Sequence, residues 1–269
     1  MELITFLIVN FNTTDFIQNT LELLPKVTKN NYLIYILDNG SRIDDYNKLK
    51  NIVRHYPEVT LERWETGLRG SLAHGTAMNY LTSKVETPYF SILDSDAVWL
   101  KKNWDEILIK RLDDKIKIIG TQADGLKHKD FPMVYAAFLE SKAFKELKID
   151  FRPKDINRGQ DTGFEMREKY RAAGYEGLVL VGQNTREYKK GPFARLTGVV
   201  EHYLEDNPEI IAVHFGRGSN LGTQKFKRGL KRYFYKIPRI GRHFLRKRGE
   251  KEIAQWLQIC KEIVKKQTL

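Results

Sequence analysis

Short apolar runs alternate with helix-forming segments along the first hundred residues, and this alternation most narrows the folds open to the chain. Strands separated by helices are typical of an α/β architecture, in which a mostly parallel sheet carries helices on both faces. A first helix follows the N-cap cluster 12–15 and should end at Pro25, which removes a backbone donor. The other predicted elements of this half are strands 3–10, 32–37, 59–63 and 89–93, and helices 44–55 and 72–81.

The second half of the chain has a less regular pattern. Residues 184–200 are rich in Gly, Arg and Lys without a clean period, and we expect a long mobile loop there. The predicted strands are 116–120, 132–138, 177–181 and 210–213, and the predicted helices are 99–112, 142–147 and 161–173.

Two carboxylates one residue apart, Asp94 and Asp96, end the apolar run 89–93. Ligands of open α/β sheets bind beyond the carboxyl ends of the strands. One acid there can accept hydrogen bonds from a ribose, and the other can hold a divalent cation against a diphosphate. Because Asp-x-Asp is also common in loops and at helix caps, the motif predicts such a site only through its position.

Asp38, Asp161 and His214 are the other candidate site residues. Asp38 follows an apolar strand, so it could read a nucleobase imide, although Asp-Asn-Gly-Ser is also strong turn chemistry. Asp161 opens a predicted helix as a simple N-cap or as a general base held ionised by the helix dipole. His214 ends a strand, where imidazole suits Mn²⁺, and Arg217 follows it as a candidate phosphate partner; the alternative is a structural histidine.

The order of these motifs resembles the GT-A fold glycosyltransferases, particularly glycosyltransferase family 2 and its rhamnosyltransferase-like branch, over about residues 3–220. The resemblance implies an inverting, metal-dependent enzyme that uses Mn²⁺ or Mg²⁺ and a nucleotide-sugar donor, with UDP or dTDP favoured. Two departures are Gln160, where the family often has Glu, and Thr66-Gly67-Leu68, where it has Asn-x-Gly. The implied roles are base packing for Asn10 and Phe11, base reading for Asp38, ribose binding for Asp94 with Ser95 beside it, metal binding for Asp96 and His214, catalysis for Asp161, and donor contacts for Arg69, His74 and Arg217.

Basic charge is concentrated near the C-terminus. Residues 1–223 hold 31 basic and 31 acidic side chains, whereas residues 224–251 hold 12 basic and 1 acidic. Apolar residues recur there at helical spacing, and Pro238 predicts two short helices that meet near Ile237-Pro238. Such an element is typical of binding to an anionic membrane surface, although it could instead pack on the body. Nucleic acid is less favoured because no recognisable binding motif accompanies the charge.

We therefore expect a catalytic region over 1–223, divided into a nucleotide-sugar half (1–97) and an acceptor half (98–223), and a basic helical extension over 224–269. The chain begins with a strand pattern and not a signal peptide, and no apolar run is long enough to span a bilayer. A lone cysteine, Cys260, excludes a disulfide framework. These features predict a cytoplasmic enzyme on the inner face of a membrane, acting on a lipid-linked or polysaccharide acceptor.

Two other functions remain open from the sequence. A sugar nucleotidyltransferase would usually have a Gly-rich basic loop after the first strand, and residues 10–13 do not form one. A non-catalytic nucleic-acid or membrane adaptor on a sugar-nucleotide fold would bind DNA in a salt-dependent way without turnover.

Overall fold

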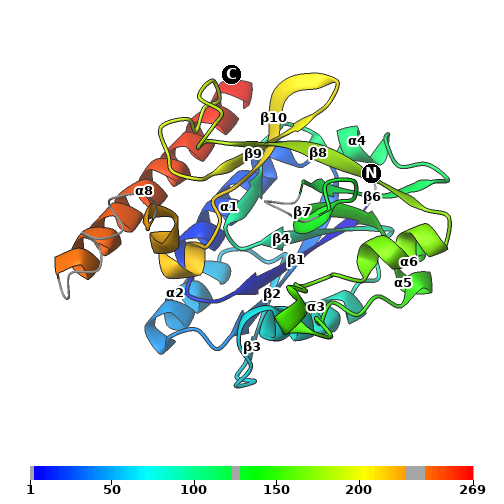
Figure 1. Ribbon diagram of the computed structural model, residues 1–269, viewed down its shortest axis with the longest axis horizontal. Helices are drawn as coiled ribbons and strands as arrows, with labels where there is room; N and C mark the ends of the chain where they lie inside the picture. Colours follow the sequence, from blue (N-terminus) through cyan, green and yellow to red (C-terminus); the bar gives the residue numbers. More distant parts are fainter. Residues whose placement is uncertain (1–2, 123–127, 228–239, 269) are drawn as a thin grey trace.

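The computed structural model describes residues 3–122, 128–227 and 240–268. Within these residues the chain forms a ten-stranded sheet of order β3-β2-β1-β4-β7-β6-β8-β9-β10-β5 (Figure 1). The strands are β1 (Leu3–Asn10), β2 (Asn31–Asn39), β3 (Val59–Trp64), β4 (Tyr89–Asp94), β5 (Ala97–Trp99), β6 (Ile116–Thr121), β7 (Met133–Glu140), β8 (Glu176–Asn184), β9 (Val200–Leu204) and β10 (Asn207–His214).

The sheet is parallel in its first part and mixed beyond it. Strands β3, β2, β1 and β4 all run parallel, whereas β7 pairs antiparallel with both β4 and β6. The last strands, β8, β9, β10 and β5, pair antiparallel in that order. The α/β class is therefore confirmed; the four-strand parallel part lies in the half with the clearest strand and helix alternation, and β6 and β8 form one further parallel pair in the second half.

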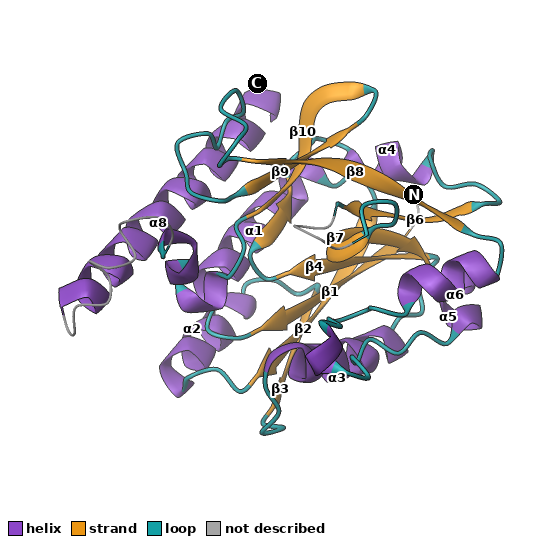
Figure 2. Cartoon of the chain, in the orientation of Figure 1, coloured by secondary structure: helices purple, strands orange, loops and turns teal. Residues whose placement is uncertain are grey.

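Helices cover both faces of the sheet, as the colouring in Figure 2 makes clear. In β1, Phe6 and Ile8 belong to one buried cluster, and Leu7 and Val9 belong to the other. Because successive side chains of a strand point to opposite faces, a strand buried on both faces is apolar throughout.

The helices are α1 (Thr14–Val27), α2 (Ile43–Val53), α3 (Gly70–Ser83), α4 (Trp104–Ile109), α5 (Ser141–Leu147), α6 (Met166–Ala172) and α8 (Ile240–Thr268).

Three sequence predictions were wrong in detail. Helix α1 continues through Pro25 to Val27, because a proline in the last turn disturbs few helical hydrogen bonds. The predicted helix 99–112 is shorter, and its first residue ends strand β5 instead. Residues 185–199 do lack helix and strand, but Phe193, Leu196 and Val199 are buried in the core, so this segment packs on the body.

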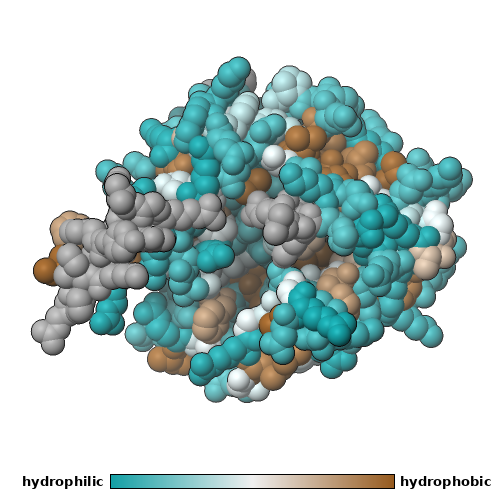
Figure 3. Space-filling model, in the orientation of Figure 1, coloured by the Kyte–Doolittle hydropathy of each residue, from teal (hydrophilic) through white to brown (hydrophobic). Residues whose placement is uncertain are grey.

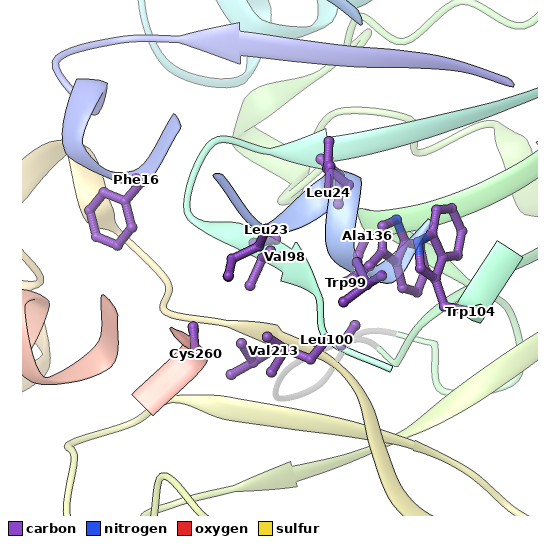
Figure 4. Packing of buried hydrophobic residues seen from close by; sticks show 14 of the residues in the cluster. Phe16, Leu23, Leu24, Val98, Trp99, Leu100, Trp104, Ala136, Val213 and Cys260 are labelled. Atoms are coloured by element: carbon purple, nitrogen blue, oxygen red, sulfur yellow. The ribbon is translucent and has the colours of Figure 1, made fainter. Parts of the chain in front are cut away.

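The long helix α8 packs on the body beside α1 (Figure 1). Trp256 of α8 is fully buried, and its ring centroid lies 5.3 Å from that of Phe16. Figure 4 shows Cys260 of α8 and Val213 of β10 within the same cluster, together with the Trp99–Trp104 pair, whose rings stack at 4.3 Å. The predicted helix junction near 237–238 lies outside the described residues, but the prediction of a short second helix is wrong, since α8 is 29 residues long. None of the described helices, α8 included, has a stretch apolar enough for a bilayer crossing.

Candidate active site

Sheet pairing explains why Asp94, Asp96 and His214 meet. The chain leaves β4 at Asp94, passes through Ser95 and Asp96, and enters β5 at Ala97. Strand β5 pairs antiparallel with the end of β10, where His214 lies opposite Ala97. His214 Nε2 is thereby 3.2 Å from Asp96 Oδ1 and 3.7 Å from Asp94 Oδ2.

These three residues fit a divalent cation. One ligand atom from each lies within 4.8 Å of the others, which a single ion can bridge. Two carboxylates and one imidazole suit Mn²⁺, and carboxylates with water suit Mg²⁺. Asp94, Asp96 and His214 are therefore the residues that would hold the metal.

The two acids differ in their electrostatics. Burial raises the pKa of Asp94 to about 6, and the charges of Asp96 and Asp161 add to the increase, while His74 and His214 oppose it. Burial also acts against ionisation of Asp96, but His214 and the Gly218 N–H hold its pKa below the ordinary value. A bound cation would favour the ionised form of both acids.

The segment after β10 supports the acid pair. The Gly218 N–H donates to Asp96 Oδ2 at 2.7 Å, and the Phe215 N–H donates to the Asp96 carbonyl at 2.9 Å. A Cβ at Gly218 would come within 2.8 Å of the Asp96 Cβ, so only glycine allows this approach. The Tyr135 ring stacks on His214 with its centroid at 4.7 Å.

Asp161 lines the same cleft but does not begin a helix. Helix α6 starts at Met166 with Glu165 as its N-cap, and Asp161 precedes it in a turn. The predicted stabilisation by a helix dipole is therefore wrong. Instead, Asp161 Oδ1 accepts hydrogen bonds from the Ser71 hydroxyl at 2.5 Å and from the Thr162 N–H at 2.9 Å, which orient the carboxylate.

His74 connects the acid pair to the Asp161 turn. Its Nε2 lies 3.8 Å from Asp94 Oδ1, and its Nδ1 is 3.3 Å from the Thr162 hydroxyl. The imidazole thus bridges β4 and the segment that carries the candidate base. Arg69, the N-cap residue of α3, is exposed and lines the cleft about one helical turn before His74.

Asn10 and Asp38 lie side by side at the carboxyl ends of β1 and β2. Both are fully buried, and Asn10 Nδ2 donates to Asp38 Oδ2 at 2.7 Å. Asp38 also forms an ion pair with Arg63 of β3 at 3.2 Å. Neither side chain is among those that line the cleft, whereas Phe11, which is 48% exposed, and Asn39 are.

The cleft encloses about 1420 Å³ and brings both halves of the chain together. Figure 3 shows a hollow near the middle of the face in view. Ser95, which is half-buried, and the exposed Arg217 line it with the residues above. Of the predicted site residues, the cleft contains all except Asn10 and Asp38.

Sequence reasoning missed two basic residues of the cleft, the half-buried Arg186 and the buried Lys225. Both line the cleft, and the Arg186 guanidinium donates to the Lys225 carbonyl at 2.9 Å. Burial lowers the pKa of Lys225 to about 8, although Asp96 and Glu252 oppose the shift. No local pattern distinguishes this lysine from the basic residues that follow it; only its folded position does.

Comparison with solved structures identifies the same fold in glycosyltransferases. The mannosyltransferase PcManGT from Pyrobaculum calidifontis, in complex with GDP-Man and Mn²⁺, aligns with a TM-score of 0.53 and 14% identity over 94% of this chain and 74% of that one. S. aureus TarS 1-349 in complex with UDP-GlcNAc aligns with a TM-score of 0.52 and 14% identity over 67% and 56% of the two chains. Among curated proteins, none matches the sequence significantly.

At such low identity the structural likeness shows the fold, which is that of the GT-A glycosyltransferases. The family assignment comes from the sequence itself. The model of glycosyl transferase family 2 matches residues 5–170, which is more than half of the chain. The match spans the strands that carry Asp38 and Asp94 and the segment that carries Asp161. The chain therefore belongs to glycosyl transferase family 2.

Proposed function

We propose that this family member is an inverting, metal-dependent glycosyltransferase that moves a sugar from a nucleotide donor to an acceptor hydroxyl. The observation that carries the proposal is that the metal-ligand group of Asp94, Asp96 and His214 lines one cleft together with Asp161. A cation site and a base on opposite elements of one cleft are what displacement of a nucleoside diphosphate requires. A sugar nucleotidyltransferase receives no support from the family match.

On the donor side, Asp96 and His214 would hold Mn²⁺ or Mg²⁺ together with one carboxylate oxygen of Asp94. The other oxygen of Asp94 would accept hydrogen bonds from the ribose, with Ser95 beside it. When bound, the cation neutralises charge on the leaving diphosphate. Phe11 is exposed in the cleft and offers an aromatic face to the base. The remaining assignments place Arg69, His74 and Arg217 at the phosphates, and Asn10 with Asp38 beneath the base, where their mutual hydrogen bond fixes the end of β1 and β2.

On the acceptor side, Asp161 takes the proton of the attacking hydroxyl. The hydrogen bonds from Ser71 and Thr162 orient its carboxylate toward one direction of approach. As the acceptor oxygen bonds to the anomeric carbon, the bond from that carbon to the diphosphate breaks, and the configuration inverts. Because attack is direct, no covalent sugar intermediate forms.

Calorimetric titration tests the donor site. Wild-type protein and the Asp96→Ala variant are titrated with UDP, dTDP and GDP, with and without Mn²⁺, and exposed Asp44→Ala is the matched control. We expect UDP or dTDP to bind tightly only with the metal, and Asp96→Ala to lose that metal dependence. GDP is included because the PcManGT structure contains GDP-Man. Binding of no nucleotide by folded wild type would refute the proposal and favour the adaptor function.

We also propose that the start of α8 attaches the enzyme to an anionic membrane surface, near a lipid-linked or polysaccharide acceptor. Ile240 and Phe244 are one helical turn apart and are 54% and 51% exposed. Exposed Arg242, Arg246 and Lys247 flank them. Apolar side chains ringed by basic ones suit the boundary between headgroups and acyl chains.

Vesicle sedimentation tests this attachment. A variant with Phe244→Asn and Lys247→Gln should bind vesicles of anionic phospholipid more weakly than wild type, and neither should bind neutral vesicles. Lys265→Gln, at the exposed far end of the same helix, is the control. Equal sedimentation of all three proteins would contradict the proposal, and salt-sensitive binding of DNA in preference to vesicles would point to nucleic acid.

A further inference from the structure

Lys225 is a buried cation in the wall of the catalytic cleft, beyond the residues that the family model matches. It belongs to a short 3-10 turn, Thr223–Phe226, that follows β10. The residue is only 7% exposed, yet it lines the cleft that contains Asp94, Asp96 and His214. A lysine is rarely buried to this degree unless something in the site uses its charge.

The described contacts use only part of the hydrogen-bonding capacity of Lys225. Its Nζ donates to the Phe215 carbonyl and lies 3.4 Å from the centroid of the Phe215 ring. An ammonium group has three donors, so one carbonyl and one ring face leave capacity for a further acceptor. Lys225 and Asp96 line the same cleft, and among the acids the charge of Asp96 does most to favour the protonated form of the lysine.

The surroundings of Lys225 favour an anion. Arg186 and Arg217 line the same cleft, so the second half of the chain contributes three cationic side chains to the wall of the cleft that contains the acid pair. When a metal neutralises Asp94 and Asp96, this side of the cleft has an excess of positive charge. Phosphate oxygens satisfy such a site, because lysine binds phosphate as a point charge.

We propose that Lys225 binds the diphosphate of the nucleotide donor and stabilises the diphosphate as it leaves. This inference rests on the proposed function, since it requires a nucleoside diphosphate in the cleft. In addition to the metal site, the diphosphate would then have a direct contact with the C-terminal segment. The ammonium then opposes the charge that develops on the diphosphate when its bond to the sugar breaks.

Helix α8 holds the Lys225 turn in place. Phe226 is buried, and the Arg248 guanidinium lies 4.3 Å from the centroid of its ring. The Arg186 guanidinium donates a hydrogen bond to the Lys225 carbonyl. The backbone of Leu221 packs so closely on Gly249 of α8 that a Cβ there would meet it at 2.3 Å. The turn is therefore positioned by the helix and not by its own sequence.

The test compares Lys225→Met with Lys227→Met, which removes the same charge from an exposed position two residues away. Each protein is titrated with the nucleoside diphosphate that wild type binds best among UDP, dTDP and GDP, with Mn²⁺ and with EDTA. Binding of the matching nucleoside is measured by ligand-observed NMR. Thermal unfolding of each variant is recorded in parallel.

Lys225→Met should weaken diphosphate binding about 10- to 100-fold, the usual effect of losing a charge-assisted hydrogen bond. The loss should persist in EDTA, nucleoside binding should stay at the wild-type level, and Lys227→Met should behave as wild type. Equal diphosphate affinity of Lys225→Met and wild type would overturn the inference, as would a parallel loss of nucleoside binding and thermal stability. If wild type binds no diphosphate, the proposed function itself fails.

Discussion

Replacing His202 with Leu should make the protein more resistant to mild acid. His202 lies in β9, paired with Ala212 of β10, the strand that ends at His214, and it is 1% exposed. Burial, aided by the charge of His214, lowers the pKa of His202 to about 3, and the Leu180 backbone opposes the shift only in part. The folded protein therefore keeps this imidazole neutral where the unfolded chain protonates it.

The sign and size of the effect follow from linkage. An unfolded histidine has a pKa of about 6.5, so stability is unaffected above that pH and is lost as the pH falls toward about 3. A pH of 5 lies about 1.5 units below the pKa of the unfolded histidine. Each unit stabilises the unfolded chain by about 1.36 kcal/mol relative to the folded protein, so the loss of stability at pH 5 is about 2 kcal/mol. Leucine cannot bind a proton, so the variant avoids this loss.

Urea unfolding followed by tryptophan fluorescence measures the effect, since Trp99, Trp104 and Trp256 are fully buried. The quantity is the change in the free energy of unfolding between pH 7 and pH 5, which should be about 2 kcal/mol smaller for His202→Leu than for wild type. Comparing the two proteins removes groups common to both, such as Asp94. Exposed His55→Leu is the control. An equal pH dependence of His202→Leu and wild type would refute the reasoning.

Three further predictions concern the site. Asp161→Asn should lower kcat about 10²- to 10⁴-fold in a donor turnover assay, with nucleotide affinity by calorimetry unchanged, because only the proton acceptor is lost; unchanged kcat would exclude Asp161 as the base. Gly218→Ala should weaken Mn²⁺ binding about 10- to 100-fold in a metal titration, since the new Cβ would displace Asp96; Ser219→Ala is its control, and wild-type affinity would contradict the steric argument. NMR of the first product formed should show the anomeric configuration opposite to that of the donor sugar, and retention would refute direct displacement.

The first half of the fold was predictable because its signals are local. Strands β1 and β4 are buried on both faces, so each appears in the sequence as a nearly continuous apolar run. The acids that end β2 and β4 then fall at one edge of the sheet, since Asn10 pairs with Asp38 and Val9 with Asp94. Position along the chain was enough to bring both strand ends to this edge, although Asp94 lines the cleft and Asp38 does not.

The strands that complete the site gave weaker signals. Strand β5 has three residues, too few for a period, and its Trp99 reads equally well as the start of a helix. Yet this strand brings His214 to the acid pair through its antiparallel pairing with β10. The burial of Lys225 depends on α8, which begins fifteen residues later in the sequence. Neither the pairing of β5 with β10 nor the burial of Lys225 can be inferred from neighbouring residues in the sequence.

Removing everything after Thr223 would not isolate the membrane-binding role of the C-terminal segment. The truncation would delete Lys225 from the cleft and Trp256 from the core, so activity and stability would fall together with any membrane attachment. Loss of a buried tryptophan side chain alone costs about 3–5 kcal/mol, a large share of the stability of a typical domain. Substitutions at exposed Phe244 and Lys247 avoid this problem, because they leave the contacts between α8, the Lys225 turn and the core intact.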